Sequence, residues 1–230
     1  TLDNKVTKTV KIEGPVNDVV NSGPGCVLLL QPKRVVLLDV QQGKKLAEIA
    51  LKNVKYVSWS LDGQYAALMS KHTITTVTKR LELINSMHDT IRIKSACWDE
   101  TGVLIYSTLN HIRYSLLNGE RGIITTLENT LYINKVQGKL IYALDRYGEV
   151  KILTIDPTEY RFKKALANKN FPEVLRIIKN SNLVGQNIIS YLQKSGFPEI
   201  ALQFVQDPQT RFDLALEYGN LDVALEEAKK

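Results

Sequence analysis

Cysteine is scarce in this sequence, which contains only Cys26 and Cys97 among 230 residues. Two cysteines cannot build a disulfide framework, and they leave too few thiolates for a structural zinc site. We therefore expect a reducing compartment, no metal ligands, and two cysteine side chains that act as small buried hydrophobes.

Long apolar runs are also missing. The longest, Cys26–Leu30, is far shorter than the roughly 20 residues that a membrane-spanning helix needs. The sequence has no Asn-x-Ser/Thr sequon, no initiator Met and no apolar signal-peptide core. These absences favour an internal piece of a longer cytosolic protein.

Catalytic signatures are absent as well. The sequence lacks HExxH, GxSxG, Walker A and zinc-spaced Cys/His patterns. Gly23 and Gly25 resemble part of a dinucleotide fingerprint, but Leu28 stands where its third glycine belongs, so this segment is interpreted as a turn. The sequence predicts no enzyme activity and no cofactor. The alternative of a hydrolase in the propeller channel would need carboxylates or histidines that converge from several blades, but Asp62, Asp99 and Asp145 lie in turn phrases instead.

The net charge of +6 is spread thinly. Residues 1–157 carry 20 basic and 15 acidic side chains, and the basic pairs such as Lys79-Arg80 stay short. A nucleic-acid-binding propeller would need a concentrated basic face, so we expect no nucleic-acid partner.

A repeat of 39 residues dominates the first two thirds of the chain. Trp59, Gly63 and His72 recur as Trp98, Gly102 and His111, which indicates equivalent structural roles for each pair. Short runs of Val, Ile, Leu, Tyr and Thr alternate with turn signals, as expected for four short strands per repeat. Residues 1–157 are therefore predicted to form the last three to four blades of a WD40-like β-propeller, with Trp59, Trp98, Tyr106 and Tyr142 packing between blades.

The pattern becomes helical at Asp156-Pro157-Thr158-Glu159, which is typical of a capped helix start. Apolar residues then follow a helical period, with new helices expected near Pro172, Ile188, Pro198, Pro208 and Leu221. Residues 158–230 are predicted to form the start of an α-solenoid of helical hairpins. The fold class is thus a β + α multidomain chain.

The join from Ile152 to Leu166, the segment Leu183–Lys194 and the segment Thr210–Glu217 closely resemble the coatomer α-subunit family. This resemblance covers essentially the whole chain. It implies a structural scaffold subunit of the COPI vesicle coat in Golgi-to-ER retrograde and intra-Golgi transport, cytoplasmic and peripherally associated with Golgi membranes. An alternative is another propeller-solenoid trafficking scaffold, such as a clathrin-like, nuclear-pore or ciliary transport component.

In that family, the solenoid packs against the coatomer β′ subunit. The ε subunit, the ARF GTPase with the Golgi membrane, and dilysine cargo are reached through regions outside this sequence or indirectly. The candidate protein-interface residues are therefore aromatic and arginine positions of the solenoid, although packing within the solenoid is the competing interpretation for each. They are Tyr191, Phe197, Phe204, Arg211 and Tyr218.

Overall fold

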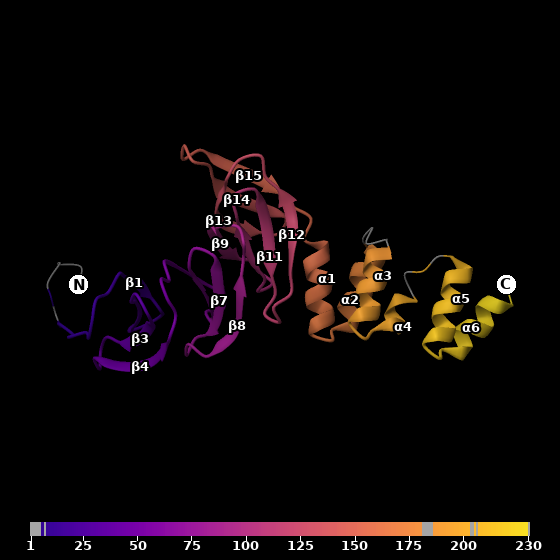
Figure 1. Cartoon of the computed structure of the whole chain (residues 1–230), viewed down its shortest axis with the longest axis horizontal. Helices are drawn as coiled ribbons and strands as arrows, with labels where there is room; N and C mark the ends of the chain where they lie inside the picture. The colour runs from indigo at the N-terminus through magenta and orange to yellow at the C-terminus, as the bar shows by residue number, and fades with distance from the viewer. Residues whose placement is uncertain (1–5, 7, 181–185, 203–204, 206, 230) are drawn as a thin grey trace. The chain divides into compact units, whose positions relative to one another are not determined.

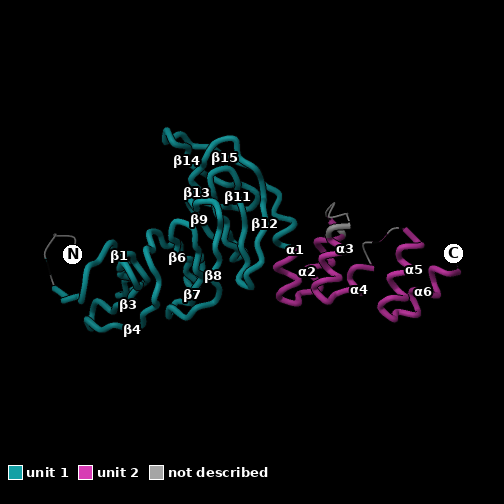
Figure 2. Tube along the Cα trace, in the orientation of Figure 1, with its two compact units in different colours: residues 1–161 teal, residues 162–230 magenta. Residues whose placement is uncertain are grey.

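The computed structural model describes all residues except 1–5, 7, 181–185, 203–204, 206 and 230. The chain divides into two compact units, residues 1–161 and residues 162–230 (Figure 2). Each unit has buried clusters of its own.

Antiparallel strands build the first unit. Within the described residues they form four sheets, each made of strands consecutive in sequence (Figure 1). Sheet 1 contains β1 (Asp18–Asn21), β2 (Cys26–Leu30), β3 (Val35–Asp39) and β4 (Lys44–Ile49). Sheet 2 contains β5 (Tyr56–Trp59), β6 (Tyr65–Met69), β7 (Thr73–Thr78) and β8 (Leu83–His88). Sheet 3 contains β9 (Ser95–Trp98), β10 (Leu104–Ser107), β11 (His111–Ser115) and β12 (Arg121–Thr126). Sheet 4 contains β13 (Tyr132–Gln137), β14 (Leu140–Leu144) and β15 (Val150–Thr154).

The second strands of sheets 2 and 3 are apolar on both faces because neighbouring sheets pack on both sides. In β6, Ala66 and Leu68 join the cluster shared with sheet 1, whereas Ala67 and Met69 join the cluster shared with sheet 3. The two-residue period of a strand sends these pairs to opposite faces. Sheets stacked in this way are propeller blades, so the prediction of three to four blades is confirmed.

The repeat places the two tryptophans equivalently. The Trp59 indole N–H donates to the carbonyl of Asn21 at 3.1 Å, and the Trp98 indole N–H donates to the carbonyl of Ser58 at 2.9 Å. Each indole therefore reaches the innermost strand of the preceding sheet. The prediction that these side chains pack between blades is confirmed.

The expected equivalence of His72 and His111 is wrong. Gly63 and Gly102 both lie in a turn at positive φ. Across the first turn Trp59 pairs with Ala66, six residues being enclosed, whereas across the second Trp98 pairs with Leu104 and only five are enclosed. The shorter turn shifts the register by one residue. His111 consequently begins β11, while His72 lies one residue before β7.

Helices follow the sheets. The described residues form α1 (Thr158–Ala167), α2 (Phe171–Asn180), α3 (Gln186–Lys194), α4 (Pro198–Ala201), α5 (Pro208–Glu217) and α6 (Leu221–Ala228). The Asp207 carboxylate caps α5 by accepting the Thr210 N–H at 2.9 Å, and the Asn220 side chain caps α6 by accepting the Val223 N–H at 3.4 Å. These caps satisfy N–H groups that the first helical turn leaves unpaired. Among the described residues, no helix has the length and apolar character needed to cross a bilayer.

Two clusters form the core of the second unit. The first takes apolar side chains from the second half of α1 and from α2, α3 and α4, with Phe162, Val174 and Leu192 fully buried. The second joins α5 and α6 through Leu214, Ala215 and Ala224. The helical periodicity of the sequence identified these buried positions because residues three and four apart share a helix face.

Candidate interaction surfaces

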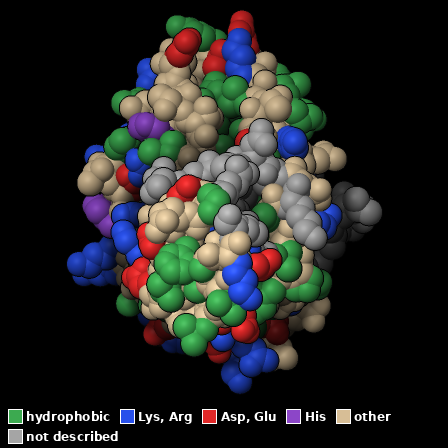
Figure 3. Space-filling view, turned by 90° about the vertical axis from the view of Figure 1, so that its right-hand side faces the viewer, with side chains coloured by type: hydrophobic (Ala, Val, Ile, Leu, Met, Phe, Trp, Pro, Cys, Tyr) green, Lys and Arg blue, Asp and Glu red, His purple; other side chains and the backbone are tan. Residues whose placement is uncertain are grey.

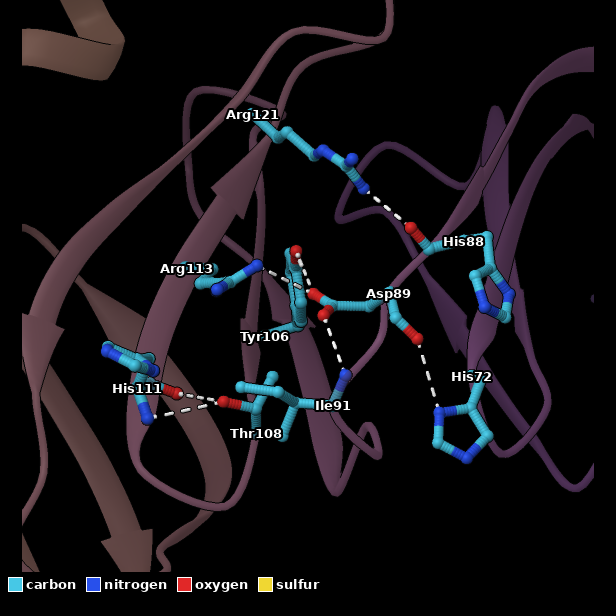
Figure 4. Close-up of polar contacts among 9 residues, drawn as sticks. All are labelled: His72, His88, Asp89, Ile91, Tyr106, Thr108, His111, Arg113 and Arg121. Atoms are coloured by element: carbon cyan, nitrogen blue, oxygen red, sulfur yellow. Dashed lines mark hydrogen bonds and ion pairs between the residues drawn. The ribbon is translucent and has the colours of Figure 1, made fainter.

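A buried carboxylate ties sheet 2 to sheet 3. Asp89, only 2% exposed, lies in the segment that links β8 to β9. Its Oδ2 accepts from Nη1 of Arg113 at 2.9 Å and from the Tyr106 hydroxyl at 3.1 Å, and its Oδ1 accepts the Ile91 N–H at 3.1 Å (Figure 4). Its backbone N–H donates to the carbonyl of His72 at 2.7 Å. We call Asp89, Tyr106, Arg113, Ile91 and His72 the Asp89 cluster.

The surroundings of Asp89 stabilise its ionised carboxylate, as expected for a group that holds two sheets together. Burial would raise the pKa of Asp89, but the Ile91 N–H, the Tyr106 hydroxyl and the Arg113 guanidinium outweigh burial and hold this pKa below its ordinary value. Burial and the adjacent Asp89 charge raise the pKa of Tyr106 to about 12. A carboxylate whose oxygens are occupied by donors, beside a phenol that stays protonated, has no acid or base ready near neutral pH.

The three histidines do not join this carboxylate in a catalytic arrangement. The ring centroids of His72 and His88 lie 5.9 Å apart. The backbone N–H of His111 donates to the Thr108 hydroxyl at 3.2 Å (Figure 4). In the described part of the chain, no group of three or more His, Cys, Asp or Glu side chains could hold a metal ion.

A hollow of about 310 Å³ lies on sheet 1. It is lined by apolar side chains such as Leu29 and Val36, and by charged ones such as Arg34 and Lys45. Arg34 and Lys45 both pair with Glu48, at 3.2 and 3.1 Å. Charges that neutralise each other at the rim suit a packing surface better than a ligand site.

The predicted interface residues lie in the helical unit and are partly buried there. Tyr191 packs on the cluster of α1–α4, and the Lys163 ammonium lies 5.0 Å from its ring centroid. Phe197 packs on the same cluster, and its ring meets that of Phe171 edge-on at 5.8 Å. Phe204 lies outside the described residues.

The remaining two candidates lie in the last helix pair, Arg211 within α5 and Tyr218 at its C-terminal end. Arg211 on α5 pairs with the Glu227 carboxylate of α6 at 3.1 Å, and that carboxylate is 2% exposed. Tyr218, directly after α5, packs against the cluster formed by α5 and α6. Arg211 and Tyr218 therefore contribute to packing within the helix pair while parts of their side chains stay accessible.

More exposed apolar side chains were missed by the sequence reasoning. Leu221 and Leu225 on α6 are 68% and 57% exposed, and Leu216 on α5 is also exposed. The sequence feature that could have identified this exposed face is the spacing of Leu221 and Leu225, which are four residues apart and therefore lie on one face of the helix. Figure 3 shows hydrophobic side chains on this side of the molecule, interspersed with acidic and basic ones.

Stacked antiparallel sheets followed by helices define the class of proteins that join β-propeller blades to an array of α-helices. A family model described as the COPA/B second beta-propeller matches residues 1–145. The chain belongs to this coatomer family, as the sequence resemblance indicated.

Curated relatives agree with this assignment. Coatomer subunit alpha of Saccharomyces cerevisiae is 79% identical over 229 residues, which cover 100% of this chain and 19% of the relative. Coatomer subunit alpha-1 of Arabidopsis thaliana is 48% identical over 227 residues, covering 99% of this chain and 19% of the relative. The chain thus spans about one fifth of the length of these relatives.

Solved structures support the fold alone. The beta-propeller domain of Cps50 (Swd1) from Myceliophteria thermophila superposes with a TM-score of 0.55 at 13% identity, covering 65% of this chain and 54% of that chain. The computationally designed Ika4 protein gives a TM-score of 0.52 at 10% identity, covering 66% of this chain and 100% of that chain.

Proposed function

We propose that this chain is a structural segment of the COPI coat that acts by assembly with other coatomer subunits and not by catalysis. The observation that carries the proposal is the 79% identity to coatomer subunit alpha along the whole chain. The Asp89 cluster is consistent with it, because a buried ion pair between blades stiffens a propeller without offering a reactive group.

The helical unit is the proposed contact with the coatomer β′ subunit. Leu221 and Leu225 give α6 an exposed apolar face, and Leu216 on α5 adds to the exposed apolar surface of the same helix pair. Apolar side chains of this size stabilise a protein interface when a partner removes them from water. Tyr191, Phe197, Arg211 and Tyr218 remain interface candidates through their accessible parts, as does Phe204 from the sequence.

The other coat partners are assigned to regions outside this chain. The ε subunit and dilysine cargo belong to other parts of the longer protein, and the ARF GTPase and the Golgi membrane are reached indirectly. The expected location is therefore the cytoplasmic face of Golgi membranes and COPI vesicles.

The test is binding of this chain to the β′ subunit, measured by co-elution in size-exclusion chromatography and by calorimetry. We expect a stoichiometric complex. Replacing both exposed leucines of α6, in the double variant Leu221→Asp/Leu225→Asp, should weaken the complex roughly ten-fold or more, because charges would replace the apolar contact. Tyr191→Ala and Tyr218→Ala then test the aromatic candidates individually.

The matched control is Leu61→Asp, an exposed leucine in the turn before β6 of the propeller. It should leave the affinity unchanged. Thermal unfolding of every variant separates lost binding from lost folding. Absence of a complex at roughly 50 µM, well above the affinity of a standard specific interface, would remove this helical unit as the β′ contact.

A further inference from the structure

Four loops lie side by side at one end of sheets 1 and 2. In antiparallel sheets of consecutive strands, the turn between the second and third strands and the linker to the next sheet leave from the same end. These loops are residues 31–34, 50–55, 70–72 and 89–94. Backbone hydrogen bonds tie each loop to the next, from the Asn53 N–H to the Pro32 carbonyl at 3.0 Å, from the Lys55 N–H to the Met69 carbonyl at 2.8 Å, and from the Ile93 N–H to the Lys71 carbonyl at 3.0 Å. The four loops therefore form one continuous surface.

This surface is strongly basic. Asp89 is the one acidic residue in the four loops, and it is buried in its own cluster. Arg34 is neutralised by its pair with Glu48. The six remaining basic side chains, which we call the basic loop surface, are Lys33, Lys52, Lys55, Lys71, Arg92 and Lys94. All are exposed except the half-buried Lys94, and within the described part of the chain none of the six forms an ion pair.

Neighbouring loops do not share this charge. At the opposite end of sheets 1 and 2, residues 22–25, 40–43, 60–64 and 79–82 contain two basic and two acidic side chains. At the basic end of sheet 3, residues 108–110 and 127–131 contain one glutamate and no basic residue. The positive charge is thus confined to one end of two sheets. Its members are scattered along the sequence, and the fold gathers them.

An exposed tyrosine borders the basic loop surface. Tyr56 follows the linker 50–55 directly and pairs with Met69 at the same end of sheet 2, and it is 57% exposed. Tyrosine is enriched in protein interfaces because its ring offers apolar area beside a polar hydroxyl.

Two other kinds of occupant fit the basic loop surface less well. None of its four loops exposes a large apolar side chain, whereas stable binding to a bilayer needs an apolar group in addition to charge. Nucleic-acid binding favours arginine and several stacked aromatic rings, but five of the six cations are lysines and Tyr56 is a single ring. Charge and one aromatic side chain together favour a peptide.

We propose that the basic loop surface binds an acidic, extended segment of a partner protein, whose carboxylates pair with the lysines and Arg92 and whose apolar side chain packs on Tyr56. Clustered cations without carboxylates beside them attract an oppositely charged segment and fix its register. This surface belongs to the propeller, so the proposal goes beyond the assembly function and does not depend on the β′ contact of the helical unit.

The experiment is fluorescence anisotropy of the full-length coatomer α chain with a fluorescein-labelled peptide of alternating Asp and Glu residues and a central Phe. We expect saturable binding that weakens at least roughly ten-fold between about 50 and 300 mM salt, because exposed charges are screened. The same peptide with Asn and Gln in place of Asp and Glu should not bind.

Charge reversal locates the site. The double variant Lys71→Glu/Arg92→Glu alters two adjacent loops and should weaken binding roughly ten-fold or more. Lys79→Glu/Arg80→Glu is the matched control, because it changes the net charge equally at the opposite end of sheet 2. It should change the affinity less than about two-fold. All four side chains are exposed, so thermal unfolding and binding to the β′ subunit should match the wild type in both variants.

The aromatic contact has its own test. Tyr56→Ser should weaken binding of the peptide that contains Phe, but not of a peptide with Ser in that position, because only the first peptide loses a contact.

Three results would overturn the proposal. Equal weakening by the two double variants would show that net charge, and not the basic loop surface, attracts the peptide. Unchanged binding by Lys71→Glu/Arg92→Glu would place the site elsewhere in the chain. Tighter binding of phosphatidylserine–phosphatidylcholine vesicles or of polyuridylate than of the peptide, lost in the same variant, would make a membrane or a nucleic acid the occupant.

Discussion

The Asp89 cluster makes a prediction whose size follows from its contacts. The substitution Asp89→Asn keeps the size of the side chain, and its remaining oxygen still accepts the Ile91 N–H. The new amide N–H₂ faces Arg113, which is also a donor, in place of the Oδ2 that accepted the 2.9 Å hydrogen bond. Loss of this charged hydrogen bond at a buried site costs about 2–3 kcal/mol of unfolding free energy.

That loss corresponds to a drop of about 5–10 °C in the unfolding temperature of a unit of this size, measured by calorimetry or circular dichroism. Glu48→Gln provides the control, because Glu48 pairs with Arg34 and Lys45 at the surface and its loss should not move the transition measurably. Equal shifts for Asp89→Asn and Glu48→Gln would refute the claim that the Asp89 cluster clamps the two sheets.

The loss of stability caused by Asp89→Asn should also depend on pH. The pKa of Asp89 in the folded state lies below its ordinary value, so the ionised carboxylate stabilises the folded state. This stabilisation is fully present above the pKa of the unfolded chain, about 3.9, and it is lost as the pH falls through the lower pKa of the folded state. The stability difference between the wild type and Asp89→Asn should therefore be constant from pH 5 to 7 and shrink below about pH 4. A difference that grows on acidification would contradict this reasoning.

Three further changes test other contacts. Trp98→Phe removes the indole donor to the Ser58 carbonyl, and urea unfolding should show a loss of about 1–2 kcal/mol. Gly122→Ala places a Cβ 2.5 Å from the Tyr114 ring, so this overpacking should cost about 1–3 kcal/mol in the same assay. Asp207→Ala removes the cap of α5, and far-UV circular dichroism should show reduced helicity with the sheet signal unchanged.

The sequence predicted the fold well because repeated packing demands repeated residues. Trp59 and Trp98 recur since each indole contacts the preceding sheet in the same way. The prediction failed for His72 and His111, because a turn shorter by one residue changes the register without disturbing the sequence offset. Periodicity identifies which residues repeat, but the length of each turn decides which strand positions they occupy.

The polar contacts were harder to predict. Asp89, Tyr106 and Arg113 follow no local motif, and they meet only because the linker after β8 passes beside the second and third strands of sheet 3. Leu221 and Leu225 were assigned to a helix but not to a surface, since four-residue spacing is equally consistent with a buried face. Which face a helix buries depends on its neighbours, and a single sequence does not name them.

The direction of the tryptophan hydrogen bonds has a consequence for synthesis. Trp59 reaches the carbonyl of Asn21, and Trp98 reaches that of Ser58, so in both cases the donor leaves the ribosome after its acceptor. During translation each new sheet can thus dock on one that has already emerged, in the order in which the chain is made. This order of acceptors before donors is compatible with adding sheets 2 and 3 one after another from the amino-terminal side.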